Sequence, residues 1–201
     1  MKSKKLQIIP LGGLGEFGMN CLAVRWEDDI IVIDAGLMFP ETELLGVDIV
    51  VPDITYLIEN KQHVRAIVLT HGHEDHIGGL PWILNELKVP VYATEFTLAY
   101  VEDKLEEHEL LDETELIEIE PRRKFTIGPF TIEPIHVTHS LADAISLAIV
   151  NAAPISVSTS ASISTRWILV FMLILIKRLI PLLRTQCLPS SPWWKPLNRS
   201  P

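Results

Sequence analysis

The sequence predicts a layered α/β fold, because segments with the pattern of strands alternate with segments with the pattern of helices. Ile30–Ile33 and, apart from Arg65, Val64–Leu69 are short apolar runs rich in β-branched residues, which is typical of buried strands. Pro81–Leu87 and Phe96–Glu107 follow the second run and have the composition of helices, the latter acidic and amphipathic.

The first strands are expected to form antiparallel hairpins. Leu6–Pro10 has the composition of a strand, and a glycine-rich loop follows it. Cys21–Trp26 alternates as a strand does, and the polar turn at residues 27–29 leads into Ile30–Ile33, which ends at Asp34.

Residues 37–53 have few element signals and are expected to be mostly loop. A short helix over Ile54–Asn60 then leads into the strand Val64–Leu69. In the helix Pro81–Leu87, the proline stands in the first turn, where its missing N–H costs little. The remaining predicted strands are Val89–Ala93, Glu115–Ile119, Lys124–Ile127, Phe130–Pro134 and Ala144–Val150.

The glycine loop has a second interpretation. Gly13-x-Gly15-x-x-Gly18 fits the fingerprint of a dinucleotide site, with Asp34 at a plausible distance. That fingerprint requires a helix directly after the glycines, whereas Met19–Trp26 has strand-like alternation. We therefore expect a hairpin whose glycines let the backbone pass close to a neighbouring site.

Residues 71–76 gather three imidazoles and a carboxylate on a loop that is expected directly after a predicted strand. This segment is called the metal loop. Imidazole nitrogen and carboxylate oxygen are zinc ligands, so the spacing His71-x-His73-x-Asp75-His76 predicts a metal site. A further ligand must come from elsewhere. We expect it to be His139, with His136 as the competing choice; alternation places these two on opposite faces of a strand.

These residues resemble a known group of proteins. The run from Thr70 to Gly79 is similar to the signature of the metallo-β-lactamase superfamily. Residues 11–20, 33–40, 45–48 and 105–108, together with His139-Ser140, resemble bacterial ribonuclease J, a member of its β-CASP group. The resemblance covers about residues 6–149. It implies the N-terminal half of an αββα sandwich, incomplete in this chain.

The resemblance also implies roles for individual residues. His71, His73 and His139 would hold one zinc ion, and Asp75 and His76 would hold a second and serve as catalytic residues. Asp34 would brace the metal loop by hydrogen bonds. Such enzymes cleave RNA phosphodiesters by metal-activated water, which implies RNA as the partner. The resemblance does not imply that this shorter chain forms the homo-oligomers of the family.

The family pattern also needs features downstream of His139: an aspartate that bridges the two ions, a distal histidine and a second lobe that grips RNA. No Asp or Glu follows Asp143, and no histidine follows His139. The family pattern implies two zinc ions, and this chain is expected to hold two or only one. Its own catalytic activity is therefore expected to be doubtful. The alternatives are a metallo-hydrolase for a small ester, thioester or lactam, and a non-catalytic zinc-binding fragment.

The composition changes sharply near residue 150. All 26 Asp and Glu lie before residue 144 and the last of ten glycines is Gly128, whereas Ser, Pro, Trp and Arg dominate the end. We expect residues 1–149 to be a partial metallo-β-lactamase domain. Residues 150–201 would be an aberrant tail from a shifted reading frame or a mis-joined gene end; a natural divergent end is the alternative.

The chain is expected to be cytoplasmic and not to span a membrane. Cys21 and Cys187 follow no ligand or disulfide spacing, and the basic start lacks a signal-peptide core. The apolar run Trp167–Ile176 is too short to cross a hydrocarbon layer of about 30 Å, which needs roughly 20 helical residues. A buried strand is expected there, with a membrane-surface segment as the alternative.

Overall fold

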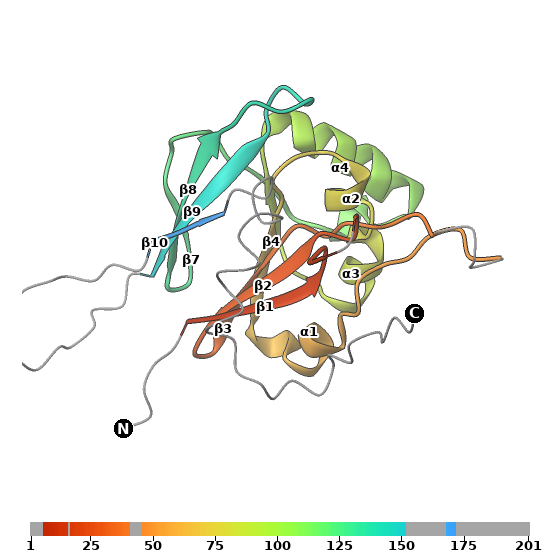
Figure 1. The fold of residues 1–201 in the computed structure, drawn as a ribbon, viewed down its shortest axis with the longest axis horizontal. Helices are drawn as coiled ribbons and strands as arrows, with labels where there is room; N and C mark the ends of the chain where they lie inside the picture. Colours follow the sequence, from red (N-terminus) through yellow and green to blue (C-terminus); the bar gives the residue numbers. More distant parts are fainter. Residues whose placement is uncertain (1–5, 16, 41–45, 152–167, 172–201) are drawn as a thin grey trace, which may run out of the picture.

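The computed structural model of the chain describes residues 6–15, 17–40, 46–151 and 168–171. Figure 1 shows two β-sheets, with helices against one of them. The strands are β1 (Leu6–Gly12), β2 (Cys21–Trp26), β3 (Asp29–Ile33), β4 (Val64–Val68), β5 (Val91–Ala93), β6 (Leu116–Glu118), β7 (Phe125–Ile127), β8 (Phe130–His136), β9 (Ile145–Asn151) and β10 (Ile168–Phe171). The helices are α1 (Thr55–Glu59), α2 (Glu74–Ile77), α3 (Leu80–Glu86) and α4 (Glu95–Glu107), with 3-10 turns at Lys61–His63 and Leu111–Glu113.

The six-stranded sheet has the order β1-β2-β3-β4-β5-β6. Its first three strands are antiparallel neighbours, whereas β3, β4, β5 and β6 run parallel. The difference follows from the connections: a tight turn joins β2 to β3, and longer segments containing helices join the parallel strands. The ends of the predicted strands differ from the observed ends by no more than two residues. The hairpin expected around the glycine loop is confirmed.

Two apolar cores lie on the two faces of this sheet. One core joins alternate residues of the central strands, such as Val32 and Ile67, to the helices through Leu57, Ile83 and Val101. The other core packs the opposite face of the sheet against the four-stranded sheet. That second core includes Val24, Ile31, Ile33, Ala66, Val68, Phe130, Ile132, Ile145, Leu147 and Ile149.

The layers seen in the described residues are therefore helices, sheet and sheet, which confirms the α/β class and part of the predicted αββα sandwich. The four-stranded sheet is antiparallel, in the order β10-β9-β8-β7. In β8 the residues alternate between buried and partly exposed, as expected for a strand that covers a core with one face.

Only part of the predicted tail is described. β9 ends at Asn151, and β10 pairs with it antiparallel, within the apolar run Trp167–Ile176. The rest of that run and residues 152–167 and 177–201 lie outside the described residues, so the boundary after residue 149 remains a prediction. In the part of the chain that the structure describes, no helix has the length and apolar character needed to cross a bilayer.

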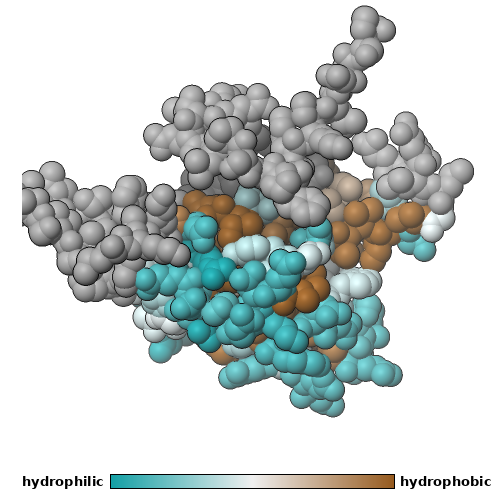
Figure 2. All heavy atoms as spheres, turned by 90° about the horizontal axis from the view of Figure 1, so that it is seen from below, coloured by the Kyte–Doolittle hydropathy of each residue, from teal (hydrophilic) through white to brown (hydrophobic). Residues whose placement is uncertain are grey.

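Figure 2 shows a largely hydrophilic face with a few hydrophobic patches. Large apolar side chains that are exposed among the described residues are Ile8, Leu14, Phe17, Phe39, Val47, Ile58, Trp82, Phe96 and Tyr100. Exposed apolar side chains occur on most folded proteins, and none of these is assigned a role by exposure alone.

The parallel strands bring polar residues to one edge of the six-stranded sheet. Asp34 follows β3, Thr70 and His71 come two and three residues after the end of β4, and Thr94 follows β5. Because parallel strands end at the same edge, residues far apart in sequence meet there. This edge holds the histidine cluster.

Candidate metal centre

The segment of residues 71–76 starts in a loop and continues into a short helix. We expect a loop over residues 71–76, and that expectation is wrong in its second half, because α2 begins at Glu74. His73 has extended backbone angles and stands directly before the helix, whose first turn holds Glu74 and Asp75. Acidic side chains favour a helix N-terminus. One turn is too short to show an apolar period, so the sequence pattern does not predict it.

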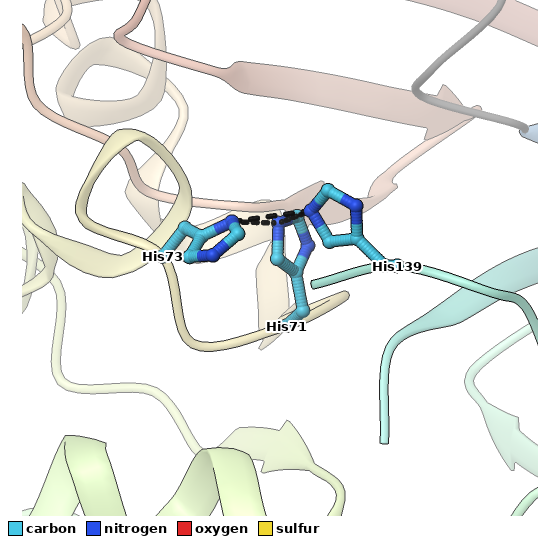
Figure 3. A group of neighbouring side chains, drawn as sticks. All are labelled: His71, His73 and His139. Carbon is cyan, nitrogen blue, oxygen red and sulfur yellow. Dashed lines mark hydrogen bonds between the residues drawn. The ribbon is translucent and has the colours of Figure 1, made fainter. Parts of the chain in front are cut away.

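Three imidazole rings converge from two separate segments of the chain (Figure 3). His71 Nε2 lies 3.0 Å from His73 Nδ1, and His139 Nε2 lies 3.0 Å from His71 Nε2 and 3.1 Å from His73 Nδ1. His71 is buried, whereas His73 and His139 are partly exposed. Among the described residues, these three form the group of side chains that could hold a metal ion together.

Three ring nitrogens at such distances cannot all be hydrogen-bonded to one another. Each nitrogen offers either one N–H or one lone pair. In a ring of three, at least one contact must therefore set two N–H groups or two lone pairs against each other. A cation that accepts all three lone pairs removes this conflict. Nitrogens on a tetrahedral zinc ion, with bonds of about 2.0–2.1 Å, lie roughly 3.3 Å apart, so the donor set fits a small divalent cation.

The outer nitrogens of two rings have hydroxyl partners. His71 Nδ1 lies 3.0 Å from Thr70 Oγ1, and His73 Nε2 lies 3.1 Å from Ser140 Oγ. Thr70 Oγ1 donates its proton to the Asp34 carboxylate, so its lone pairs remain to accept from His71. A proton on His71 Nδ1 leaves the lone pair on Nε2, which is the atom that faces the other histidines.

The environment keeps the imidazoles of His71 and His139 neutral. Burial, with the repulsion of positive charge on His76, His139 and His73, lowers the pKa of His71 to about 3. Burial and the same kind of repulsion from His73 and His76 lower the pKa of His139, although Asp75 opposes the shift. A neutral imidazole is the form that binds a metal ion, so both rings are ready for one near neutral pH.

Asp34 braces the metal loop, as the sequence predicts. Its backbone is in the left-handed region with φ of 61°, which aspartate tolerates better than most residues. Its side chain is fully buried and accepts from Thr70 N at 2.8 Å and from His76 Nδ1 at 2.8 Å. Burial alone would lower the pKa of His76, but the charge and hydrogen bond of Asp34, helped by Asp75, raise it.

Asp75 and His76, the residues expected at a second ion, lie side by side. Asp75 Oδ2 is 3.6 Å from His76 Nε2, and Asp34 holds the opposite nitrogen of that ring. Asn20, which the sequence analysis does not single out, contacts both side chains. Its Nδ2 lies 3.2 Å from Asp75 Oδ2 and 3.1 Å from His76 Nε2. The sequence signals for Asn20 are its place at the end of the glycine loop and its inclusion in residues 11–20, which carry part of the family resemblance.

The end of the glycine loop packs against the metal loop, but the glycine that permits the close approach is Gly36, which lies outside the glycine loop. Asn20 N donates to the Asp75 carbonyl at 2.9 Å, and Gly36 N donates to the Asn20 carbonyl at 2.9 Å. A Cβ at Gly36 would lie 1.8 Å from the Asp75 carbonyl oxygen. Glycine is therefore required at position 36 for the chain to pass the metal loop.

The structure separates the two histidines left open by the sequence. His139 lies in the cluster, whereas His136 is exposed at the end of β8, with its Nε2 3.0 Å from the Ala142 carbonyl oxygen. Because β8 ends at His136, His139 belongs to the following loop. The strand alternation used to contrast the two residues therefore does not apply to His139.

Comparison with known proteins agrees with this geometry. The sequence profile of the Metallo-beta-lactamase superfamily matches residues 14–151. Ribonuclease J 1 of Streptococcus pyogenes is 40% identical over 149 residues, which are 74% of this chain and 27% of that protein. Ribonuclease J2 of Bacillus subtilis is 44% identical over 143 residues, 71% of this chain and 26% of that protein. The chain thus spans about a quarter of the length of these curated relatives.

A solved structure shares the fold. The metallo-beta-lactamase fold protein YhfI from Bacillus subtilis has a TM-score of 0.50 and 21% sequence identity, over 75% of this chain and 60% of that one. Sequence profile, layer order and histidine cluster agree: the chain belongs to the metallo-beta-lactamase superfamily, whose fold implies divalent metal binding.

Proposed function

We propose that this chain is the metal-binding part of a ribonuclease J-like hydrolase that acts on RNA phosphodiesters in the cytoplasm. The observation that carries the proposal is the convergence of His71, His73 and His139 within 3.0–3.1 Å. Sequence identity of 40% and 44% to two ribonucleases J supports RNA as the substrate.

Zinc is the metal we propose. The three donors are imidazole nitrogens, which suit zinc better than magnesium or calcium, both of which prefer oxygen. His71, His73 and His139 would hold one ion, and Asp75 and His76 would contribute to a second. A bound ion would lower the pKa of a coordinated water and so supply a nucleophile near neutral pH.

The protein groups prepare the site in two ways. The Thr70 hydroxyl and the Asp34 carboxylate fix the ring of His71 with its lone pair toward the cluster. Asp34 keeps a proton on His76 Nδ1, so that Nε2 presents its lone pair on the side of Asp75. Rings oriented in advance bind an ion with less ordering cost.

The proposal is tested with purified chain and two measurements. Zinc per chain is determined by elemental analysis after exhaustive dialysis, and cleavage is followed on a 5′-monophosphorylated RNA oligonucleotide. We expect bound zinc. RNA cleavage that disappears in His73→Ala would support the proposed activity of this part of the enzyme. Cleavage of a thioester or lactam without RNA cleavage would favour the small-molecule hydrolase, and bound zinc without any turnover would favour the non-catalytic fragment.

A further inference from the structure

We propose that Asp143 is a positioning residue that holds His139 in the metal centre by anchoring its loop to the start of helix α4. This inference rests on the proposed metal site. His71 and His73 follow a strand of the six-stranded sheet, whereas His139 lies between β8 and β9 of the four-stranded sheet. The three histidines therefore come together only if the two sheets keep a fixed position relative to each other at this edge.

The Asp143 carboxylate reaches helix α4 across more than 40 residues of sequence. Its Oδ2 accepts from the Thr94 hydroxyl and from Thr97 N at 3.2 Å, and its Oδ1 lies 3.5 Å from Thr97 Oγ1. Thr94 directly precedes the helix but makes no capping hydrogen bond with its own side chain. Asp143 thus supplies the acceptor and the negative charge that a helix N-terminus favours.

The backbone of the same loop is tied at its two ends. Val137 N donates to the Ala144 carbonyl at 2.9 Å, and Ile145 N donates to the Thr70 carbonyl at 3.0 Å. Between these ties, the Asp143 side chain makes the contacts to α4, four residues after His139. The direction in which His139 enters the cluster therefore depends on that carboxylate.

Helix α4 also contacts the other half of the centre. Lys104 Nζ lies 3.0 Å from the Glu74 carboxylate, next to His73 in sequence. The ring of Tyr100 packs against Gly72, at 3.0 Å from where a Cβ would stand. Since α4 meets both the metal loop and the His139 loop, the Asp143 contacts fix the distance between the two sets of ligands.

The test measures Zn²⁺ affinity of the full chain by competition with a chromophoric chelator, and Co²⁺ absorption as a report on ligand geometry. We expect Asp143→Ala to weaken Zn²⁺ binding by about 10- to 100-fold, as for residues that orient metal ligands. Asp143→Asn keeps an acceptor oxygen and should restore most of the affinity. Thr94→Val removes a donor to Asp143, and its effect should not add to that of Asp143→Ala.

Asp53 offers a matched control. It is also an aspartate beside a helix N-terminus, accepting from Thr55 N at 2.9 Å at the start of α1. Asp53→Ala should leave Zn²⁺ affinity unchanged within about threefold, below the roughly 10-fold loss typical of residues that orient metal ligands, because its hydrogen bond is to α1, which holds none of the proposed ligands. Equal losses in Asp53→Ala and Asp143→Ala, or an unchanged affinity in Asp143→Ala, would overturn the inference. If Asp143→Ala does not fold, Thr94→Val decides, because it removes a donor to the same carboxylate. An unchanged Zn²⁺ affinity in Thr94→Val then overturns the inference.

The outcomes also separate this inference from the proposed function. Wild-type chain that binds Zn²⁺ but cleaves no RNA contradicts the proposed activity, and the role of Asp143 is still decided by affinity. Wild-type chain that binds neither Zn²⁺ nor Co²⁺ overturns both.

Discussion

The Asp34 carboxylate lies 2.8 Å from His76 Nδ1, and both side chains are buried. This contact joins the end of β3 to helix α2, across 42 residues of sequence. It sets the orientation of the His76 ring. Burial lowers the pKa of that ring, but the charge and hydrogen bond of Asp34, together with the charge of Asp75, outweigh burial and raise the pKa. The candidate centre therefore depends on a buried carboxylate that belongs to none of the expected ligand sets.

Asp34→Asn should destabilise the protein by about 3 to 5 kcal/mol, because it leaves His76 and Thr70 without a charged acceptor in a buried place. Asparagine also tolerates the left-handed backbone at this position, so the change reports on the carboxylate rather than on strain. Urea unfolding of both proteins measures the difference. A loss below about 1 kcal/mol would mean that the contact contributes no more than an ordinary hydrogen bond.

His139→Ala should weaken Zn²⁺ binding by more than about 100-fold, because losing a ligand costs more than disturbing a residue that orients one. His136→Ala is the control, since His136 lies outside the cluster and contacts the Ala142 carbonyl. Its affinity should stay within a few-fold of wild type. Isothermal titration with Zn²⁺ checks both variants, and a larger loss in His136→Ala would reverse the assignment.

Gly36→Ala should destabilise the protein by at least about 3 kcal/mol, since the new Cβ would overlap the Asp75 carbonyl oxygen and backbone must shift. Gly46→Ala provides the comparison, because a Cβ there meets nothing within 4 Å and only the positive φ of 82° opposes it. That backbone strain costs about 1 kcal/mol. Thermal unfolding should show a clearly larger fall for position 36, and similar falls would show that the metal loop moves easily.

The stability of the metal-free protein should fall as the pH drops below 6.5. The pKa of His71 is lowered from 6.5 to about 3, so in this window the unfolded chain takes up a proton that the folded chain does not. One such proton corresponds to at most about 1.4 kcal/mol per pH unit. The raised pKa of His76 acts in the window above 6.5, where stability falls as the pH rises through the folded pKa.

Urea unfolding in the presence of a chelator, at several pH values between 4.5 and 6.5, measures this slope. His71→Asn should have a shallower slope than wild type, because it removes one histidine with a lowered pKa and leaves His139 as the other. Parallel slopes for the two proteins would show that other groups cause the acid sensitivity.

The sequence predicts the strands around the centre well, because their signals are local. Cys21–Trp26 alternates along its own length, and Val64–Val68 is apolar except for Arg65. The sequence also gathers the candidate residues of the metal loop within six positions. Helix α2 escapes prediction, because a single turn offers no period to read.

The residues that position the ligands could not be predicted, because their partners are distant in sequence. Asn20 meets Asp75 across 55 residues, and Asp143 meets Thr94 across 49. Neither contact leaves a local pattern, since an asparagine after glycines and an aspartate in a turn are both common in loops. Only the folded sheets show which elements these side chains join.

The grouping of His71, His73 and His139 has a consequence for the order of folding. His71 and His139 are separated by 68 residues and follow strands of different sheets. Bringing them together closes a long loop of chain at an entropic cost. An ion that binds all three rings selects conformations in which that loop is already closed, and mass action then favours them. Metal uptake during refolding should therefore lag behind the formation of either sheet alone and mark the moment at which the two halves dock.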